Sequence, residues 1–354
     1  MATVDKVWRE ADTTPTKIDD ALRAMLSEIH HEDQHFVPAR VINLVCIVDS
    51  EYSGEIANRL RGVGRYHASR TIVCSVEPDR ETIDAVATMS APSISDEQGI
   101  ALLRETVIIS CGEQHLDRLD RLVDPLIISD LPTCVWSPHG HDVGLESLMQ
   151  LADVVLFDSA DEIDTKRALR HAMRLSQQAY LVDLAWLRTT PWRERIAATF
   201  DPLPLRGQLE LFSSLEIRVH PESEGAALLL FGWLASRLKW RTSPLLRRGE
   251  DLIGSAAGHR QDVKLAVVSD VTMPVRGLSG ITLETAAGRK LSLDRGHGGL
   301  RAHYDNSRGT EREWTILGAS RGEPGILGEG MRQAMLRDRT FFPALDAATT
   351  LLPQ

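Results

Sequence analysis

Apolar positions in the first half of the chain form five continuous, β-branched runs, and stretches with helical spacing lie between them. Continuous apolarity predicts strands that are covered on both faces. Strands that alternate with helices predict a doubly wound, Rossmann-like α/β domain with a mostly parallel sheet, over residues 40–182. The predicted strands are residues 41–48, 70–76, 106–111, 133–136 and 153–157. The predicted helices are residues 54–64, 81–88, 115–123, 144–151 and 159–180, the last capped by Ser159 or Asp161.

An amphipathic helix is predicted before this domain. It starts from a capping Thr14 and from Pro15, a residue suited to a first helical turn. Its apolar stripe consists of Ile18, Leu22, Met25, Leu26 and Ile29. We expect residues 1–39 to form an N-terminal helical arm that covers either the following domain or a partner, and periodicity does not choose between them.

The second half has shorter elements and more turn residues. Pro191, Pro202 and Pro204 predict a hinge with a short helix and extended flanks at residues 183–204. Strand patterns and hairpin turns, one of them at Ala287 and Gly288, predict an α+β domain with an antiparallel sheet over residues 183–354. The predicted strands are residues 209–220, 263–271, 281–285, 289–293, 299–305 and 312–319, and the predicted helices are residues 225–240 and 330–352, the latter interrupted at Pro343.

Composition excludes several classes of protein. Forty basic and fifty acidic residues give a net charge of -10, which disfavours a nucleic-acid partner, because phosphate backbones require a basic surface. The N-terminus has no signal-peptide pattern, and no apolar run approaches twenty residues, so we expect a cytoplasmic protein without a membrane span. The single cysteines Cys46, Cys74, Cys111 and Cys134 fall in predicted strands, which predicts buried, reduced thiols.

Motifs for chemistry are few. The first strand-to-helix turn carries only Gly54 where a dinucleotide or phosphate loop needs several glycines, and its Asp49 and Glu51 would repel a pyrophosphate. We therefore predict no cofactor. His139 and His141 follow the fourth strand, but a metal site would need a third ligand from elsewhere, so we expect surface histidines and no metal. Since no nucleophile motif with a paired base is present, no catalytic residue is predicted, and a binding protein is favoured over an enzyme.

A local excess of positive charge lies between Gly225 and Gly249, a window with no acidic residue. It includes Arg237, Lys239 and Arg241. The window is either a solvated helix end or an electropositive surface for a phosphorylated metabolite or an acidic partner.

Four segments carry a resemblance to a known family, namely PARVINLVCIV, GRYHASRTIVCSV, DLPTCVWSP and above all DLAWLRTTPWRERIAATFD, at Asp183–Asp201. Through them the chain from Ile18 onward resembles the glucose-6-phosphate dehydrogenase assembly proteins, the OpcA family of cyanobacteria and actinobacteria. The resemblance implies two family domains that meet near the last of these segments. It further implies a non-catalytic protein that binds glucose-6-phosphate dehydrogenase, promotes its assembly and activates it, and so supports NADPH production by the oxidative pentose phosphate pathway. The resemblance assigns no redox-active cysteine of the cyanobacterial relatives to a position of this chain, because its four cysteines fall in strands that are predicted to be buried.

Partner contacts are expected first in the tryptophan- and arginine-rich segment, because these residue types dominate interface hot spots. The expected contacts are Trp186, Arg188, Trp192 and Arg193, followed by Arg237, Lys239 and Arg241. Their alternative role is structural, a hinge held by stacking of tryptophan and arginine. An alternative function is a small-molecule-sensing α/β protein that uses the crevice near His139 and His141 or the basic window; an enzyme without a recognisable motif is a third.

Overall fold

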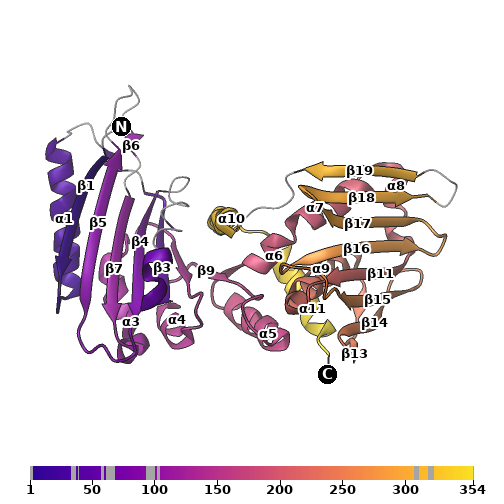
Figure 1. Cartoon of the computed structure of the whole chain (residues 1–354), viewed down its shortest axis with the longest axis horizontal. Helices are drawn as coiled ribbons and strands as arrows, with labels where there is room; N and C mark the ends of the chain where they lie inside the picture. Colours follow the sequence, from indigo (N-terminus) through magenta and orange to yellow (C-terminus); the bar gives the residue numbers. More distant parts are fainter. Residues whose placement is uncertain are drawn as a thin grey trace. The chain divides into compact units, whose positions relative to one another are not determined.

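The computed structural model describes residues 3–32, 37–38, 40–56, 60, 68–92, 100–101, 104–306, 311–317 and 323–353. The chain forms two compact units (Figure 1). The first comprises Met1–Phe157, Gln178–Val182 and Leu327–Met335, and the second comprises Asp158–Gln177, Asp183–Ile326 and Leu336–Gln354. The predicted domain boundaries at residues 39 and 182 stay predictions.

An eight-stranded sheet forms the first unit, in the order β1-β5-β7-β4-β3-β8-β9-β10. The strands β7, β4, β3, β8 and β9 pair in parallel, whereas β5 is antiparallel to β7 and β1 is antiparallel to β5. Every side chain of β4 is buried, as continuous apolarity predicts. The mostly parallel sheet is therefore confirmed. The strands are β1 (Thr3–Glu10), β3 (Ile42–Asp49), β4 (Ser69–Val76), β5 (Asp84–Pro92), β7 (Arg104–Cys111), β8 (Thr133–Trp136), β9 (Val154–Phe157) and β10 (Tyr180–Asp183).

Helices of the first unit cover this sheet. The predicted N-terminal helix is α1 (Pro15–Glu32), which buries Ile18, Leu22, Met25 and Ile29 and packs along β5 (Figure 1). Strand β1, which precedes α1 in the chain, was not predicted from the sequence. The other helical elements are η1 (Ser50–Tyr52), η2 (Glu113–Arg118), α3 (Leu119–Val123), η3 (Asp124–Leu126) and α4 (Asp142–Leu148), and β2 (Val37–Pro38) pairs with β6 (Ile100–Ala101). The helix predicted at residues 54–64 lies partly outside the described residues.

The helix predicted at residues 81–88 is wrong, because this segment lies in strand β5. Ala85, Ala87 and Met89 are buried at alternate positions, which is the period of a strand. The segment is too short for its periodicity to separate a strand from a helix. Pairing with β1 on one side and β7 on the other decides for the strand.

A nine-stranded sheet forms the second unit, in the order β12-β14-β15-β11-β16-β17-β18-β19, with β13 paired to β14. The prediction of an antiparallel sheet is wrong for one pair, since β11 and β15 are parallel. A parallel pair requires a long crossover, which includes helix α9 (Glu224–Leu238). The strands are β11 (Phe212–Val219), β12 (Arg241–Thr242), β13 (Leu246–Arg248), β14 (Asp251–Ala257), β15 (Asp262–Ser269), β16 (Leu278–Thr285), β17 (Lys290–Gly296), β18 (Gly299–Asp305) and β19 (Glu311–Leu317).

Helices α9 and α11 (Phe341–Leu351) pack against each other in the second unit. A Cβ atom at Gly232 would lie 2.0 Å from the backbone oxygen of Ala344, so glycine is what allows this approach. Helix α5 (Thr165–Ser176) packs against α11. Its cap is Asp164, which accepts a hydrogen bond from the amide of Lys166 at 2.9 Å, rather than the predicted Ser159 or Asp161.

The prolines of the predicted hinge begin helices instead of leaving extended flanks. Residues 183–206 form α6 (Leu184–Arg188), α7 (Thr190–Phe200) and α8 (Leu203–Arg206), and the 3-10 helix η4 (Leu209–Leu211) follows them. Pro191 and Pro204 occupy first turns, where a missing amide hydrogen costs nothing. The predicted interruption at Pro343 is wrong for the same reason. The break falls between α10 (Glu323–Leu336) and α11, where Arg337 has a φ of 54°.

Candidate functional site

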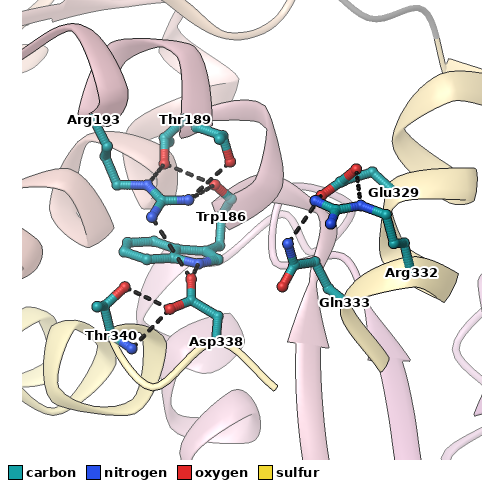
Figure 2. Close-up of polar contacts among 9 residues, drawn as sticks. Trp186, Thr189, Arg193, Glu329, Arg332, Gln333, Asp338 and Thr340 are labelled. Carbon is teal, nitrogen blue, oxygen red and sulfur yellow. Dashed lines mark hydrogen bonds and ion pairs between the residues drawn. The ribbon is translucent and has the colours of Figure 1, made fainter. Parts of the chain in front are cut away.

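The tryptophan- and arginine-rich segment lies in the core of the second unit. Trp186, Trp192 and Arg193 expose only 2%, 3% and 9% of their surface. Figure 2 shows the guanidinium group of Arg193 lying over the indole ring of Trp186, with its carbon 3.5 Å from the ring centroid. Trp186, Trp192 and Arg193, which were expected at a partner surface, are therefore buried.

Hydrogen bonds fix Arg193 in this position. Its Nε donates to the hydroxyl of Thr189 at 3.0 Å, and another guanidinium nitrogen donates to the hydroxyl of Thr190 at 2.9 Å. The carboxylate of Asp338 lies 3.7 Å from the guanidinium. Burial lowers the pKa of Arg193 to about 10, although the charge of Asp338 opposes this shift.

Asp338 connects the segment to the start of α11. It accepts hydrogen bonds from the indole Nε1 of Trp186 at 3.0 Å, from the amide of Thr340 at 2.8 Å and from the hydroxyl of Thr340 at 2.7 Å (Figure 2). Burial disfavours the charged carboxylate, but these hydrogen bonds outweigh burial and lower the pKa of Asp338. The same figure shows a separate cluster on α10, where Arg332 donates to Glu329 at 2.9 Å.

These contacts favour the structural alternative for Trp186, Trp192 and Arg193. The polar contacts of the Arg193 guanidinium, with Thr189, Thr190 and Asp338, all lie inside the second unit. The indole ring of Trp186 covers one face of the group. A partner would have to open the core to reach them. Direct contact between these residues and a partner stays a prediction.

Arg188, the fourth residue of this set, forms a bidentate ion pair with Asp158, with both nitrogen–oxygen distances at 2.8 Å. Asp183 lies beside this pair and caps α6 by accepting from the amide of Ala185 at 2.9 Å. It also accepts from the amide of Ser159 at 3.2 Å. Burial, together with the nearby charge of Asp158, raises the pKa of Asp183 to about 7.

The basic residues at the end of α9 have the opposite character. Arg237, Lys239 and Arg241 are exposed, and none of them forms an ion pair within the described part of the chain. Their neighbour Arg247, by contrast, pairs with Glu224 at 2.7 Å. Lys239 ends the helix in the left-handed conformation, with a φ of 54°. The second predicted set is therefore accessible to an acidic partner.

His139 and His141, where the sequence predicts a crevice, follow β8 at the point beside β3 where the strand order reverses. The amide of Asp49 donates to the Nδ1 of His139 at 3.0 Å, and the Nε2 of His141 lies 2.9 Å from a carboxylate oxygen of Asp49. Burial lowers the pKa of His139, although Asp49 opposes this shift. Among the described residues, no group of three histidine, cysteine, aspartate or glutamate side chains is placed to hold a metal ion.

All four cysteines are free and buried, as the sequence predicts. Burial raises the pKa of each thiol, to about 11 in Cys111. Thiolates are the reactive form of cysteine, so these side chains are inert in the folded protein. No helix in the described ranges is long and apolar enough to cross a membrane.

The second unit also contains a pocket that was not predicted from the sequence. It has a volume of about 590 Å³ and lies between α7, α8 and the strands β18 and β19. Arg195, Arg289 and Arg312 line it. They lie far apart along the sequence, so no local motif could have grouped them.

Comparison with protein families identifies both halves of the chain. The family described as the N-terminal domain of a glucose-6-phosphate dehydrogenase subunit matches residues 61–174. The family described as the C-terminal domain of the same subunit matches residues 179–342. The chain belongs to the glucose-6-phosphate dehydrogenase assembly protein family, OpcA. The resemblance drawn from the sequence is thereby confirmed.

Curated OpcA relatives match about half of this chain. The protein named OxPP cycle protein OpcA from Synechococcus elongatus is 29% identical over 171 residues, which are 47% of this chain and 38% of the relative. Its namesake from Synechocystis sp. is 26% identical over 172 residues, 48% of this chain and 36% of the relative. The matched part therefore spans less than two fifths of either relative.

Solved structures show only distant likeness to this OpcA family member. A super-repressor mutant of Gal80p from Saccharomyces cerevisiae covers 89% of the chain, and 91% of its own length is matched, with 9% identity and a TM-score of 0.48. The apo scyllo-inositol dehydrogenase from Lactobacillus casei covers 89%, with 96% of its own length matched, 11% identity and a TM-score of 0.45. Likeness of this degree carries no argument about function.

Proposed function

We propose that the chain is a non-catalytic assembly factor and activator of glucose-6-phosphate dehydrogenase, which supports NADPH production by the oxidative pentose phosphate pathway. The observation that carries this proposal is the match of both family domains, in order, to residues 61–174 and 179–342. The name of the relatives, which refers to the OxPP cycle, supports the same pathway.

The non-catalytic part of the proposal rests on the family name and on one feature of the fold. In a doubly wound sheet a cofactor would sit beyond β3, at the first strand-to-helix turn. That turn presents Asp49 and Glu51, whose charges oppose a cofactor phosphate, and Asp49 is in contact with His139 and His141. A binding role for the chain fits these residues better than cofactor-dependent chemistry.

The surface that we propose for the dehydrogenase is the basic cluster of Arg237, Lys239 and Arg241. These side chains are exposed and lack ion-pair partners within the described residues, so they are available to acidic groups on another protein. Charge complementarity of this kind mainly raises the association rate and selects the partner. Activation requires tighter binding to the active oligomer than to the inactive form, and about 1.4 kcal/mol of difference shifts that equilibrium tenfold.

The test measures glucose-6-phosphate dehydrogenase activity against glucose 6-phosphate concentration, using the enzyme from the same organism, with and without an equimolar amount of this chain. We expect a lower half-saturation concentration or a higher maximal rate with the chain present. A triple variant, Arg237→Glu with Lys239→Glu and Arg241→Glu, should lose most of this activation, and the loss should be smaller at high salt.

A matched control carries Arg9→Glu, Arg121→Glu and Arg170→Glu, three exposed arginines on other elements that undergo a charge reversal of the same kind. The control should activate like the unmodified chain. Equal activation by both triple variants would rule out the basic cluster as the contact surface. Absence of any kinetic effect and of co-elution with the unmodified chain would refute the activator proposal itself.

A further inference from the structure

The pocket of the second unit has the size of a ligand site. Its volume of about 590 Å³ falls within the range of about 300–1,000 Å³ that small-molecule sites occupy. Helices α7 and α8 form one wall, and the sheet end made by β18, β19 and the turn before β17 forms the other. All of these elements belong to one compact unit.

Three arginines converge on this pocket without carboxylate partners. Arg195 comes from α7, Arg289 from the turn between β16 and β17, and Arg312 from β19. Among the described residues that line the pocket none is acidic, and none of the three arginines forms an ion pair with a described residue. The buried Nε of Arg195 also has no hydrogen-bond acceptor among the described residues. The pocket therefore holds clustered positive charge that a bound anion would neutralise.

Strand register explains why aromatic rings accompany these arginines. Tyr304 of β18 lies directly opposite Arg312 of β19, so their side chains share one face of the sheet. Trp314 follows Arg312 by two residues and lies on that same face. The hydroxyl of Tyr304 donates to the side-chain oxygen of Gln208 at 3.0 Å, which holds its ring at the pocket wall. The half-buried indole of Trp314 offers an apolar surface beside the charge.

We infer that this pocket binds a phosphorylated small molecule, with its phosphate on Arg195, Arg289 and Arg312 and its ring against Trp314. Planar guanidinium groups match phosphate oxygens geometrically, and tryptophan stacks on sugar and nucleobase rings. A sugar phosphate and a nucleotide share this chemistry. A polyanion is disfavoured, because the chain has a net charge of -10. The site differs from the basic cluster at Arg241 and is independent of the function proposed above.

Isothermal titration calorimetry with the full chain tests this inference, using AMP, glucose 6-phosphate and inorganic sulfate as probes at low ionic strength. We expect a phosphate ester to bind at least tenfold more tightly than sulfate. Preference for AMP would identify a nucleotide site and preference for glucose 6-phosphate a sugar phosphate site. Failure of both esters to bind, or sulfate binding as tightly as they do, would overturn the inference. The assay contains no dehydrogenase, so its outcome is independent of the activator proposal.

Variants locate the binding. Arg195→Gln and Arg312→Gln should each weaken ester binding by about tenfold or more, the loss expected for a charged hydrogen bond. Arg121→Gln removes an exposed arginine in the first unit and should leave the affinity unchanged. Trp314→Phe keeps a ring but should abolish the change in tryptophan fluorescence on ligand binding. Unchanged affinity in folded Arg195→Gln and Arg312→Gln proteins, checked by circular dichroism, would place any binding elsewhere and refute the site.

Discussion

Replacement of Arg193 by methionine separates a structural role from a partner contact. Methionine keeps an unbranched apolar stem but removes the guanidinium group, which stacks on Trp186 and donates to Thr189 and Thr190. Because the group exposes about a tenth of its surface, water cannot replace these contacts in the folded state. The variant should therefore lose stability in the second unit.

The magnitude follows from the contacts. The cation–π stack is worth about 0.5–2 kcal/mol, and each hydrogen bond of a charged donor about 1.5–3 kcal/mol. The loss is partly offset because burying a charge is itself costly, as the lowered pKa of Arg193 shows. We expect a net loss of about 3 kcal/mol. For a unit of this size that loss lowers the melting temperature by roughly 6–12 °C.

Differential scanning calorimetry measures this loss, with Arg237→Met as the matched control. The control makes the same substitution at an exposed arginine and should change stability by less than about 0.5 kcal/mol. In the dehydrogenase assay, Arg193→Met should still activate at temperatures well below its melting transition. An Arg193→Met protein with unchanged stability and lost activation would refute the structural reasoning and restore Arg193 as a contact residue.

Two further predictions concern single buried positions. Asp183 keeps its proton up to about pH 7 in the folded state but only to about pH 4 when unfolded, so its contribution to unfolding free energy falls by about 1.4 kcal/mol per pH unit between these values. Asp183→Asn binds no proton at this position. Its unfolding free energy relative to that of the unmodified chain should therefore rise by about 2–3 kcal/mol as the pH rises from 5 to 7 in urea titrations. A difference that stays constant with pH would show that Asp183 is ionised throughout. Gly232→Ala places a Cβ atom 2.0 Å from the backbone oxygen of Ala344 and should cost about 1–3 kcal/mol in thermal unfolding, whereas Gly207→Ala meets nothing within 4 Å. Equal melting temperatures for these two glycine variants would contradict the close approach of α9 and α11.

The inner strands of the first sheet could be predicted because a strand that is buried on both faces has a recognisable sequence pattern. Such strands are continuous apolar runs, as in β3 and β4. An outer strand has no continuous apolar run of this kind. In β5 the small residues Ala85 and Ala87 fit a helix as well as a strand, and the pairing with β1 and β7 decides. The partner strand β1 lies more than seventy residues earlier in the chain, beyond any local pattern.

Burial of the tryptophan- and arginine-rich segment could not be predicted from residue type. Tryptophan and arginine are enriched at interfaces, but stacked and hydrogen-bonded pairs of them also occur in cores. The deciding residue is Asp338, which accepts from the indole of Trp186 and lies beside Arg193. It is separated from both by well over one hundred residues. Only the folded chain shows that these polar groups meet within the second unit.

Two arginines of α7 show how the same residue type serves two purposes. Arg193 and Arg195 are two positions apart, and at 3.6 residues per turn they point about 200° apart around the helix. Arg193 meets Thr189, Thr190 and the ring of Trp186, whereas Arg195 faces the pocket that Arg312 lines from the sheet. Substitution of Arg193 should therefore change stability, and substitution of Arg195 should change ligand affinity. If instead each substitution changed stability and ligand affinity to the same extent, the core around Arg193 and the pocket would be coupled through α7, and the two roles would not be separate.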